Sequence, residues 1–322
     1  MRVLITGVAG FAGSHLADYL LDHTEDEIWG VVRRTRWRIA HLVGRLHLVS
    51  CDLTDPVATA RVIDRIRPDV VYHLAANARV GASWKHPWET YEANLRAQLS
   101  LMEAIVNSGT RPVVLIVGSN EVYGKPLRLP VNEDHPFRPV TPYGVSKVAQ
   151  DVMGLQYHLA FGIPVIRTRP FNHIGPRQGP GFVAADFARQ VARIEAGLQE
   201  PVIRVGNLEA RRDFTDVRDV VRAYYLASTR GHAGEVYNVG RGESHAIREI
   251  LDILLDASRV PIQVEVDPER LRPSDVPKVI CDAAKLRRET GWAPSIPFEQ
   301  SVLDTLQDWR GRVRAGDANV AR

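Results

Sequence analysis

The first half of the chain alternates short apolar runs with longer amphipathic segments. The run at 2–6 breaks into a glycine-rich turn, after which Leu16, Leu20 and Leu21 continue at helical spacing, so a strand, a turn and a helix are predicted in that order. Further strands are predicted at 28–32, 47–53, 69–76, 113–117 and 164–168, and further helices at 57–66, at 89–107 and from about 141 onward. Such a βαβ series is typical of an α/β fold with a doubly wound parallel sheet.

The pattern changes after residue 170. Long loops marked by glycine and proline surround one amphipathic helix at 182–196 and short strands near 202–205 and 236–239. These features predict a smaller lobe that covers the ligand edge of the sheet. We therefore expect a nucleotide-binding domain at 1–170, a lobe that takes up most of 171–310 with some segments returning to the first domain, and a flexible tail at 311–322.

Composition narrows the class of protein. The 322 residues are 45% hydrophobic and 25% charged, with a formal net charge of +3, so one large or two unequal cores can form. No dense Lys/Arg run with interleaved aromatics is present, which argues against nucleic acid as a partner. Cys51 and Cys281 suit neither a disulfide framework nor a metal site, so we expect no metal and favour a reducing cytoplasm. We also expect no signal peptide and no membrane span, because no apolar run is long enough.

The glycine turn and the ends of the following strands predict a dinucleotide site. Gly7, Gly10 and Gly13 let the backbone approach a pyrophosphate that rests on the N-terminal amides of the helix. The second strand ends in Arg33 and Arg34, where two guanidinium groups suit a 2′-phosphate; the alternative is a solvated basic loop. The other candidates for contact with the cofactor are Phe11, Asp52, Leu53, Leu74, Ala75 and Ala76.

Tyr143 and Lys147 stand four residues apart at the predicted start of a helix, which puts both side chains on one helical face. Because an ammonium beside a phenol favours the phenolate, we expect Lys147 to lower the pKa of Tyr143. Ser119 and Glu121 follow the strand at 113–117, at the edge where the chemistry of an open parallel sheet collects. Ser119 would hold a substrate oxygen there. Alone, the Tyr and Lys pair would be an ordinary helix face.

Arginines recur in the loops of the second half of the chain. Several arginines that converge on one cleft would clamp a diphosphate through paired hydrogen bonds. The alternative is a solvated surface, which is the commoner role of arginine. The residues concerned are Arg204, Arg211, Arg212, Arg241 and Arg272.

The segments GVAGFAG, SNEVYG, YGVSK and RPFNHIGPRQ together resemble the extended short-chain dehydrogenase/reductases that act on nucleotide sugars. The resemblance covers essentially the whole chain to about residue 310. It implies a Rossmann domain with NADP(H) preferred and NAD(H) possible, a C-terminal lobe for the nucleotide sugar, and a homodimer formed through a helical bundle. The segments FNHIGPRQGPGFV, VGNLEARRDFTDVRD, EVYNVGRGES and LRPSDVP resemble the members that reduce GDP-4-keto-6-deoxy-D-mannose.

The resemblance also implies roles for single residues. Ser119, Tyr143 and Lys147 would be catalytic, and the three glycines, Arg33, Arg34, Asp52 and Leu53 would hold the cofactor. The residues implied to hold the GDP-sugar are Asn172, Arg204, Arg212 and Arg272, with Arg212 and Arg272 at the diphosphate.

Glu121 leaves a second activity open. It occupies the place where 4,6-dehydratases of this family carry a base, and Arg33-Arg34-Thr35 also resembles GDP-mannose 4,6-dehydratase. Asn120 and the FNHIGP segment depart from that enzyme's pattern. An epimerase of the same family is a third alternative. A catalytically silent nucleotide-binding regulator is a fourth; it would predict a broken Ser, Tyr or Lys position, and none is broken.

Overall fold

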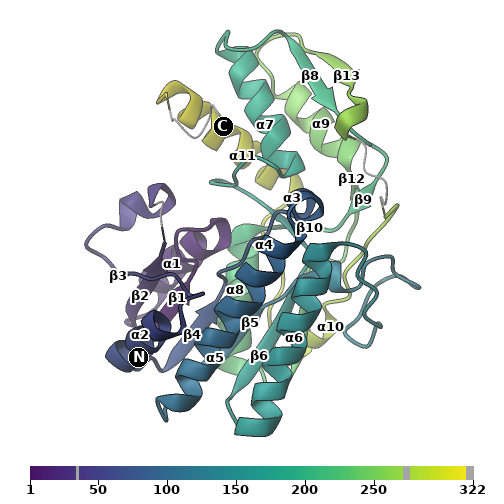
Figure 1. The fold of residues 1–322 in the computed structure, drawn as a ribbon. Helices are drawn as coiled ribbons and strands as arrows, with labels where there is room; N and C mark the ends of the chain where they lie inside the picture. Colours follow the sequence, from purple (N-terminus) through teal and green to yellow (C-terminus); the bar gives the residue numbers. More distant parts are fainter. Residues whose placement is uncertain (34–35, 271–275, 317–322) are drawn as a thin grey trace.

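A seven-stranded sheet with the order β11-β6-β5-β4-β1-β2-β3 forms the centre of the protein (Figure 1). The computed structural model describes residues 1–33, 36–270 and 276–316. Three sets of residues with predicted roles lie outside this part. They are Arg34, predicted to bind the cofactor, Arg272, predicted to bind the GDP-sugar, and residues 317–322 of the predicted tail. Every pair of neighbouring strands in the sheet runs in parallel, which confirms the predicted α/β class.

The strands of this sheet match the predicted apolar runs, with one addition at the edge. Their bounds are β1 (Arg2–Thr6), β2 (Glu27–Val32), β3 (His47–Ser50), β4 (Val70–His73), β5 (Val113–Val117), β6 (Val165–Pro170) and β11 (Val236–Val239). The sequence analysis grouped the strand at 236–239 with the smaller lobe and expected some segments to return to the first domain, and this strand is one that returns. β11 pairs with β6 along Arg167 to Pro170, because pairing satisfies the open backbone edge that β6 would otherwise present.

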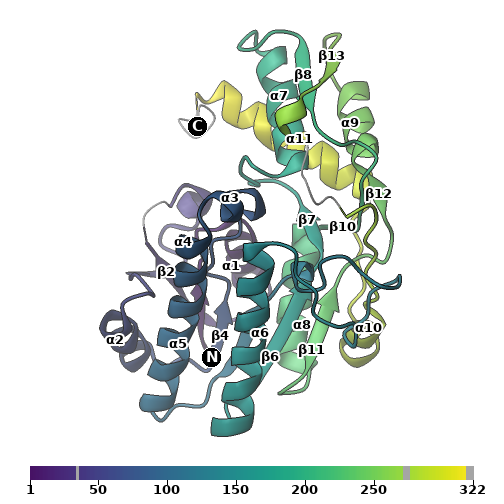
Figure 2. The same cartoon turned by 45° about the vertical axis from the view of Figure 1, so that its right-hand side comes forward.

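Helices cover both faces of the sheet (Figure 2). α2 (Pro56–Ile66), α5 (Ala97–Asn107) and α6 (Pro142–Phe161) share one core with the sheet, and α1 (Phe11–His23) and α8 (Val217–Arg230) share another on the opposite face. The helix predicted at 89–107 is instead α4 (Pro87–Tyr91), a π-helical turn (Glu92–Arg96) and α5. Short helical segments complete this domain: η1 (Trp37–Leu42), α3 (Val80–Lys85), η3 (Asn120–Val122) and α10 (Ala284–Thr290).

The smaller lobe lies beyond the carboxyl ends of the sheet strands (Figure 2). α7 (Val183–Glu195), α9 (Ile247–Asp256) and α11 (Phe298–Arg314) share its core with β8 (Val202–Val205), which pairs with β13 (Gln263–Val266). Two short sheets, β7 (Asn172–Ile174) with β10 (Phe214–Asp216) and β9 (Arg211–Arg212) with β12 (His245–Ala246), join the lobe to the first domain. Because Val313 packs in the lobe core, α11 continues beyond residue 311, where the sequence placed the start of the tail.

Candidate active site

The glycine turn between β1 and α1 is closed against the end of β4. A Cβ at Gly7, whose φ is +72°, would lie 2.9 Å from the amide nitrogen of Ala75, and one at Gly13 would lie 2.2 Å from the Gly7 carbonyl oxygen. The Gly10 amide donates to that same oxygen at 2.8 Å. A side chain at Gly7 or Gly13 is therefore excluded, which leaves a tight backbone turn at a helix N-terminus, the arrangement that fits a dinucleotide pyrophosphate. Leu74, Ala75 and Ala76 line the same edge.

The other predicted cofactor residues lie around this turn in different settings. Arg33 Nη1 is 3.7 Å from Asp52 Oδ2, and both side chains are about half exposed. Such an exposed pair is weak, so the guanidinium can exchange Asp52 for a phosphate. Leu53 is buried in the core beside α2. Phe11 stacks on His173 of β7, with ring centroids 5.7 Å apart and planes 10° apart.

Local capping explains why α6 begins where Tyr143 can reach the sheet edge. Thr141 has extended backbone and its hydroxyl accepts a hydrogen bond from the Gly144 amide at 2.9 Å, and Pro142 occupies the first helical turn. The Tyr143 amide donates to Ser83 Oγ at 3.2 Å. Tyr143 and Lys147 are 7% and 4% exposed, so both polar groups lie inside the protein rather than on a solvated helix face.

Ser119 and Glu121 lie beside Tyr143. Ser119 follows β5 and caps the N-terminus of η3, where its hydroxyl accepts from the Glu121 amide at 3.2 Å. The Ser119 hydroxyl lies close enough to the Tyr143 phenol to affect the pKa of that phenol. The Thr141 hydroxyl donates to Glu121 Oε2 at 3.5 Å, which keeps that carboxylate at the start of α6. The structure thus brings together the four residues that the sequence proposed for catalysis.

The protonation of Tyr143 differs from the expectation. Burial raises the pKa of Tyr143 above its ordinary value, the nearby Ser119 hydroxyl opposes that shift, and the Glu121 carboxylate adds to it. The phenol therefore stays protonated at neutral pH. The prediction that Lys147 lowers the pKa of Tyr143 was wrong, because burial dominates the shift and Lys147, whose Nζ lies 5.9 Å from the ring centroid, is not among the groups that lower it.

Lys147 is held by backbone. Its Nζ donates to the carbonyl of Val117 at 2.9 Å and lies 5.9 Å from the centroid of the Tyr143 ring. Burial lowers the pKa of Lys147 to about 7. The ammonium and the neutral amine are therefore both populated near neutral pH, which suits a group that takes part in proton transfer.

His73 ends β4 near Lys147 and serves as a core residue. The Thr6 hydroxyl accepts from the Ala75 amide at 3.2 Å and hydrogen-bonds His73 Nδ1 at 2.9 Å. Burial, with a smaller effect from Lys147, lowers the pKa of His73 to about 3. The ring is therefore neutral, and it fastens β4 to β1 below the site.

Asn94, in the π-helical turn, is a supporting residue that the sequence reasoning missed. Its Nδ2 donates to Ser146 Oγ at 2.9 Å, and Ser146 Oγ donates to the Tyr143 carbonyl at 2.7 Å. Its Oδ1 accepts from the Asn77 amide at 2.6 Å. A π-helical turn inside a helix often marks a functional site. In the sequence, Asn94 is simply a polar residue within a predicted helix, and only the structure shows that its side chain is buried.

The predicted substrate residues are spread over several short strands of the lobe. Asn172 begins β7, where it pairs with Phe214. Arg212 in β9 donates to the Val276 carbonyl at 2.6 Å. Arg204 lies apart from both, in β8, and its side chain is 60% exposed with Glu265 Oε2 at 4.0 Å.

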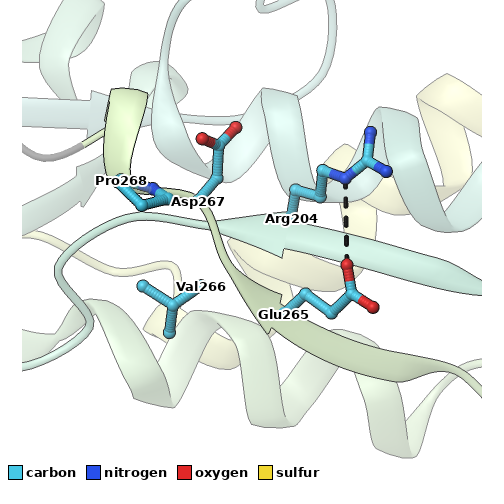
Figure 3. Close-up of a pocket in the computed structure, with 5 residues that line it drawn as sticks. All are labelled: Arg204, Glu265, Val266, Asp267 and Pro268. Carbon is cyan, nitrogen blue, oxygen red and sulfur yellow. Dashed lines mark ion pairs between the residues drawn. The ribbon is translucent and has the colours of Figure 1, made fainter.

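Arg204 borders a surface hollow of about 300 Å³ between β8 and β13 (Figure 3). The lining residues are Arg204, Glu265, Val266, Asp267 and Pro268. The hollow includes none of the four residues gathered at the sheet edge, so Arg204 is not brought to Tyr143. Among the residues that the structure describes, no three His, Cys, Asp or Glu side chains gather as metal ligands, and no helix is long and apolar enough to cross a membrane.

The model of a protein family described as GDP-mannose 4,6 dehydratase matches residues 4–305. The chain belongs to this family. The GDP-6-deoxy-D-mannose reductase of Pseudomonas aeruginosa is 36% identical over 97% of this chain and 98% of its own length. The GDP-mannose 4,6 dehydratase 2 of Arabidopsis thaliana is 34% identical over 93% of this chain and 84% of its own length.

A solved structure from the same family has the same fold. It is described as RMD from Pseudomonas aeruginosa complexed with NADPH, and it has a TM-score of 0.85 and 36% identity over 97% of this chain and 99% of its own. The resemblance to extended short-chain dehydrogenase/reductases is therefore confirmed.

Proposed function

We propose that the protein reduces the 4-keto group of GDP-4-keto-6-deoxy-D-mannose to give GDP-6-deoxy-D-mannose, also called GDP-D-rhamnose. The observation that carries the proposal is a buried, protonated Tyr143 beside Ser119 at the carboxyl edge of the sheet. A reduction needs a proton donor of this kind at the oxygen of the carbonyl. The likeness to the Pseudomonas aeruginosa reductase over nearly the full length of both chains supports this choice of substrate.

NADPH is the proposed cofactor, with NADH as a possible substitute. Gly7, Gly10 and Gly13 would hold the pyrophosphate on backbone, and Arg33 would hold the 2′-phosphate. When bound, the nicotinamide supplies a hydride to the carbonyl carbon. The NADPH in the related Pseudomonas aeruginosa structure supports the preference for the phosphorylated cofactor.

The side chains at the sheet edge would supply the proton and stabilise charge. Tyr143 donates its phenolic proton to the oxygen that becomes an alkoxide. Because Ser119 Oγ accepts from the Glu121 amide, its own hydrogen can be donated to the same oxygen. Lys147 lies behind the tyrosine and can return a proton to it, since its pKa is near 7.

The matched pair Tyr143→Phe and Tyr157→Phe tests the proton donor. Both tyrosines are buried on α6, but the Tyr157 hydroxyl donates to Glu103 of α5 and not to a residue of the candidate site. We expect Tyr143→Phe to lower kcat by about 10²–10⁴-fold and to leave GDP binding unchanged. Tyr157→Phe should keep most of the activity. Turnover in Tyr143→Phe close to that of the wild type would refute the assignment.

A GDP-mannose 4,6-dehydratase is the second candidate. Glu121 favours it, because a dehydratase needs a base beside the sugar. The Glu121 carboxylate lies close enough to Tyr143 to raise the pKa of the phenol, so it would also lie near a sugar bound there. Separate incubations with GDP-mannose and with GDP-4-keto-6-deoxy-D-mannose plus NADPH distinguish the two activities. Loss of NADPH absorbance in the second incubation alone supports the reductase. Conversion of GDP-mannose without added NADPH supports the dehydratase.

Asn172, Arg204, Arg212 and Arg272 are the proposed contacts of the GDP-sugar. Arg212 and Arg272 are the residues proposed at the diphosphate, and Arg272 lies outside the described residues. The Arg212 guanidinium donates to the Val276 carbonyl at 2.6 Å, which limits how far its side chain can move. Arg212→Met should raise KM for the GDP-sugar and leave NADPH affinity unchanged. Arg204→Met is the comparison, because Arg204 borders the separate hollow. If Arg204→Met raised KM for the GDP-sugar more than Arg212→Met does, Arg204 rather than Arg212 would be the stronger contact of the GDP-sugar.

A homodimer is proposed through the outer face of α5 and α6. Val145, Val152 and Leu159 are spaced by seven residues on α6 and are exposed, and Leu99 on α5 is exposed as well. Such an apolar stripe on neighbouring helices is typical of an interface. The double variant Val152→Glu, Leu159→Glu should sediment as a monomer, whereas Val266→Glu on exposed β13 should leave the mass unchanged. A monomeric wild type would refute the proposal.

The cytoplasm is the proposed location. Both cysteines, Cys51 and Cys281, are buried free thiols, which is typical of a reducing compartment. Detection of the tagged protein in a secreted or membrane fraction would contradict this placement.

A further inference from the structure

The loop that follows β7 contains a residue in an unusual conformation. β7 carries Asn172, a proposed substrate contact, and leads directly into residues 175–178. Arg177 has φ +68°, and in the described part of the chain only Arg67 shares a positive φ among residues other than glycine. Arg67 ends α2, where a left-handed residue is ordinary. Arg177 ends no helix, so surrounding contacts must hold it in this conformation.

Three elements bind the backbone of this loop. The Pro176 carbonyl accepts from His15 Nε2 of α1 at 2.9 Å, and the Arg177 carbonyl accepts from Arg38 Nε of η1 at 2.9 Å. The Arg177 amide donates to Asp308 Oδ2 of α11 at 3.0 Å. Two consecutive residues therefore join the nucleotide-binding domain to the smaller lobe.

The Arg177 side chain strengthens the same junction. Nη2 donates to Asp18 Oδ2 at 2.5 Å and to His15 Nδ1 at 2.6 Å, and Nη1 donates to the Arg38 carbonyl at 3.3 Å. The side chain is 15% exposed, so water screens these charge-assisted bonds only weakly. His15 Nε2 faces both the Pro176 carbonyl and Arg177 Nε, which is 3.3 Å away, and burial lowers the pKa of His15 to about 4, which favours the neutral ring.

The junction lies directly against the glycine turn. Arg38 Nη1 is 3.5 Å from the carbonyl oxygen of Ala9 in that turn. On the other side, the Phe11 ring of the turn stacks on His173, the neighbour of Asn172 in β7. The strand proposed to meet the sugar is thus attached on both sides to the turn proposed to hold the cofactor.

We propose that Arg177 is a positioning residue, which holds β7 at a set distance from the glycine turn and so aligns the sugar with the nicotinamide. The inference rests on the proposed function. Arg177 touches no reacting atom; it acts through β7 and the loop. Since a shift of about 1 Å in reacting groups costs on the order of 10²-fold in rate, loss of this bridge should lower kcat more than it weakens binding.

Arg177→Met and Arg177→Lys test the proposal, with Arg310→Met as the matched control. Arg310 is also 15% exposed and pairs with Glu195, but its bonds stay within the smaller lobe. We expect Arg177→Met to lower kcat by about 10–100-fold, with KM for NADPH and for the GDP-sugar changed by less than about 3-fold. Arg177→Lys keeps the charge facing Asp18 and should be intermediate. Arg310→Met should match the wild type.

The deuterium isotope effect separates positioning from a general loss of structure. With NADPH deuterated at the transferred position, Arg177→Met should show a larger isotope effect on kcat than the wild type, because hydride transfer becomes slower than product release. Partial unfolding would reduce the fraction of active enzyme and leave the isotope effect unchanged. An unchanged isotope effect, or equal losses in Arg177→Met and Arg310→Met, would overturn the proposal.

A second measurement keeps the two proposals distinguishable. If the wild type neither reduces the keto sugar nor dehydrates GDP-mannose, the proposed function fails. Amide hydrogen exchange over 172–178, with NADPH and GDP present, then decides the role of Arg177. Faster exchange in Arg177→Met than in Arg310→Met supports the bridge. Equal exchange overturns it.

Discussion

The burial of Lys147 has a measurable consequence for stability. Its pKa is about 7 in the folded protein, against an ordinary value of 10.5. Between these values the unfolded chain binds more protons than the folded one, so the free energy of unfolding rises with pH across that window. Below pH 7 the ammonium is charged in both states and the cost of burying it is largest. This cost is about 5 kcal/mol there and falls to about 2 kcal/mol at pH 9.

Lys147→Met removes this cost and nearly preserves the side-chain length. We expect the variant to be more stable than the wild type at pH 7 and to lose turnover. Urea unfolding at pH 7, 8 and 9, followed by tryptophan fluorescence, measures the difference in the free energy of unfolding. Between pH 7 and 9 that difference should shrink by roughly 1 kcal/mol per pH unit.

A matched surface variant isolates the effect of burial. Lys125 is exposed, so Lys125→Met measured in parallel gives the contribution of removing a surface charge, which can be subtracted. The slope with pH is the deciding quantity, because changes in packing alter the free energy of unfolding equally at each pH. A difference between Lys147→Met and wild type that stays constant from pH 7 to pH 9 would refute the reasoning.

Three further substitutions test local structure. Gly13→Ala should abolish NADPH binding and reduce soluble yield, because its Cβ would lie 2.2 Å from the Gly7 carbonyl oxygen; NADPH fluorescence titration checks this, and tight binding would contradict it. Gly311 lies within α11, and a Cβ added there would have open space around it, so Gly311→Ala should stabilise the protein by about 0.5–1 kcal/mol because alanine favours the helix. Urea unfolding measures this, and a loss of stability would count against the helical geometry. Thr141→Ala removes the hydroxyl that caps the Gly144 amide and should cost about 1 kcal/mol; an unchanged urea midpoint would show that the cap contributes nothing.

Local signals explain the predictions that the structure confirms. A run such as Val3 to Ile5 is buried by helices on both faces of the sheet, so its apolar character is visible without knowing the fold. The spacing of Gly7, Gly10 and Gly13 reflects backbone contacts within one turn. The position of Tyr143 at the start of α6 follows from Thr141 and Pro142 next to it. Each of these features depends on residues that are close together in the chain, so it can be predicted from the amino-acid sequence.

Long-range contacts explain what was missed or mistaken. β11 joins the sheet because β6 leaves an open edge, and nothing within 236–239 records that edge. Asn94 supports Tyr143 through Ser146, more than fifty residues away along the chain. Arg177 owes its left-handed backbone to partners on α1, η1 and α11, so it looks like an ordinary loop residue in the sequence.

The class of the fold, the glycine turn and the segments that follow β5 and begin α6 arise from neighbouring residues, so they can be predicted from the amino-acid sequence. The protonation of the site depends on the whole folded chain. Whether Tyr143 is a phenol and whether Lys147 is charged depend on how much water the folded chain removes from each group. Hydration is lost through residues distant in sequence, so the spacing of Tyr143 and Lys147 predicted their proximity but not their charge.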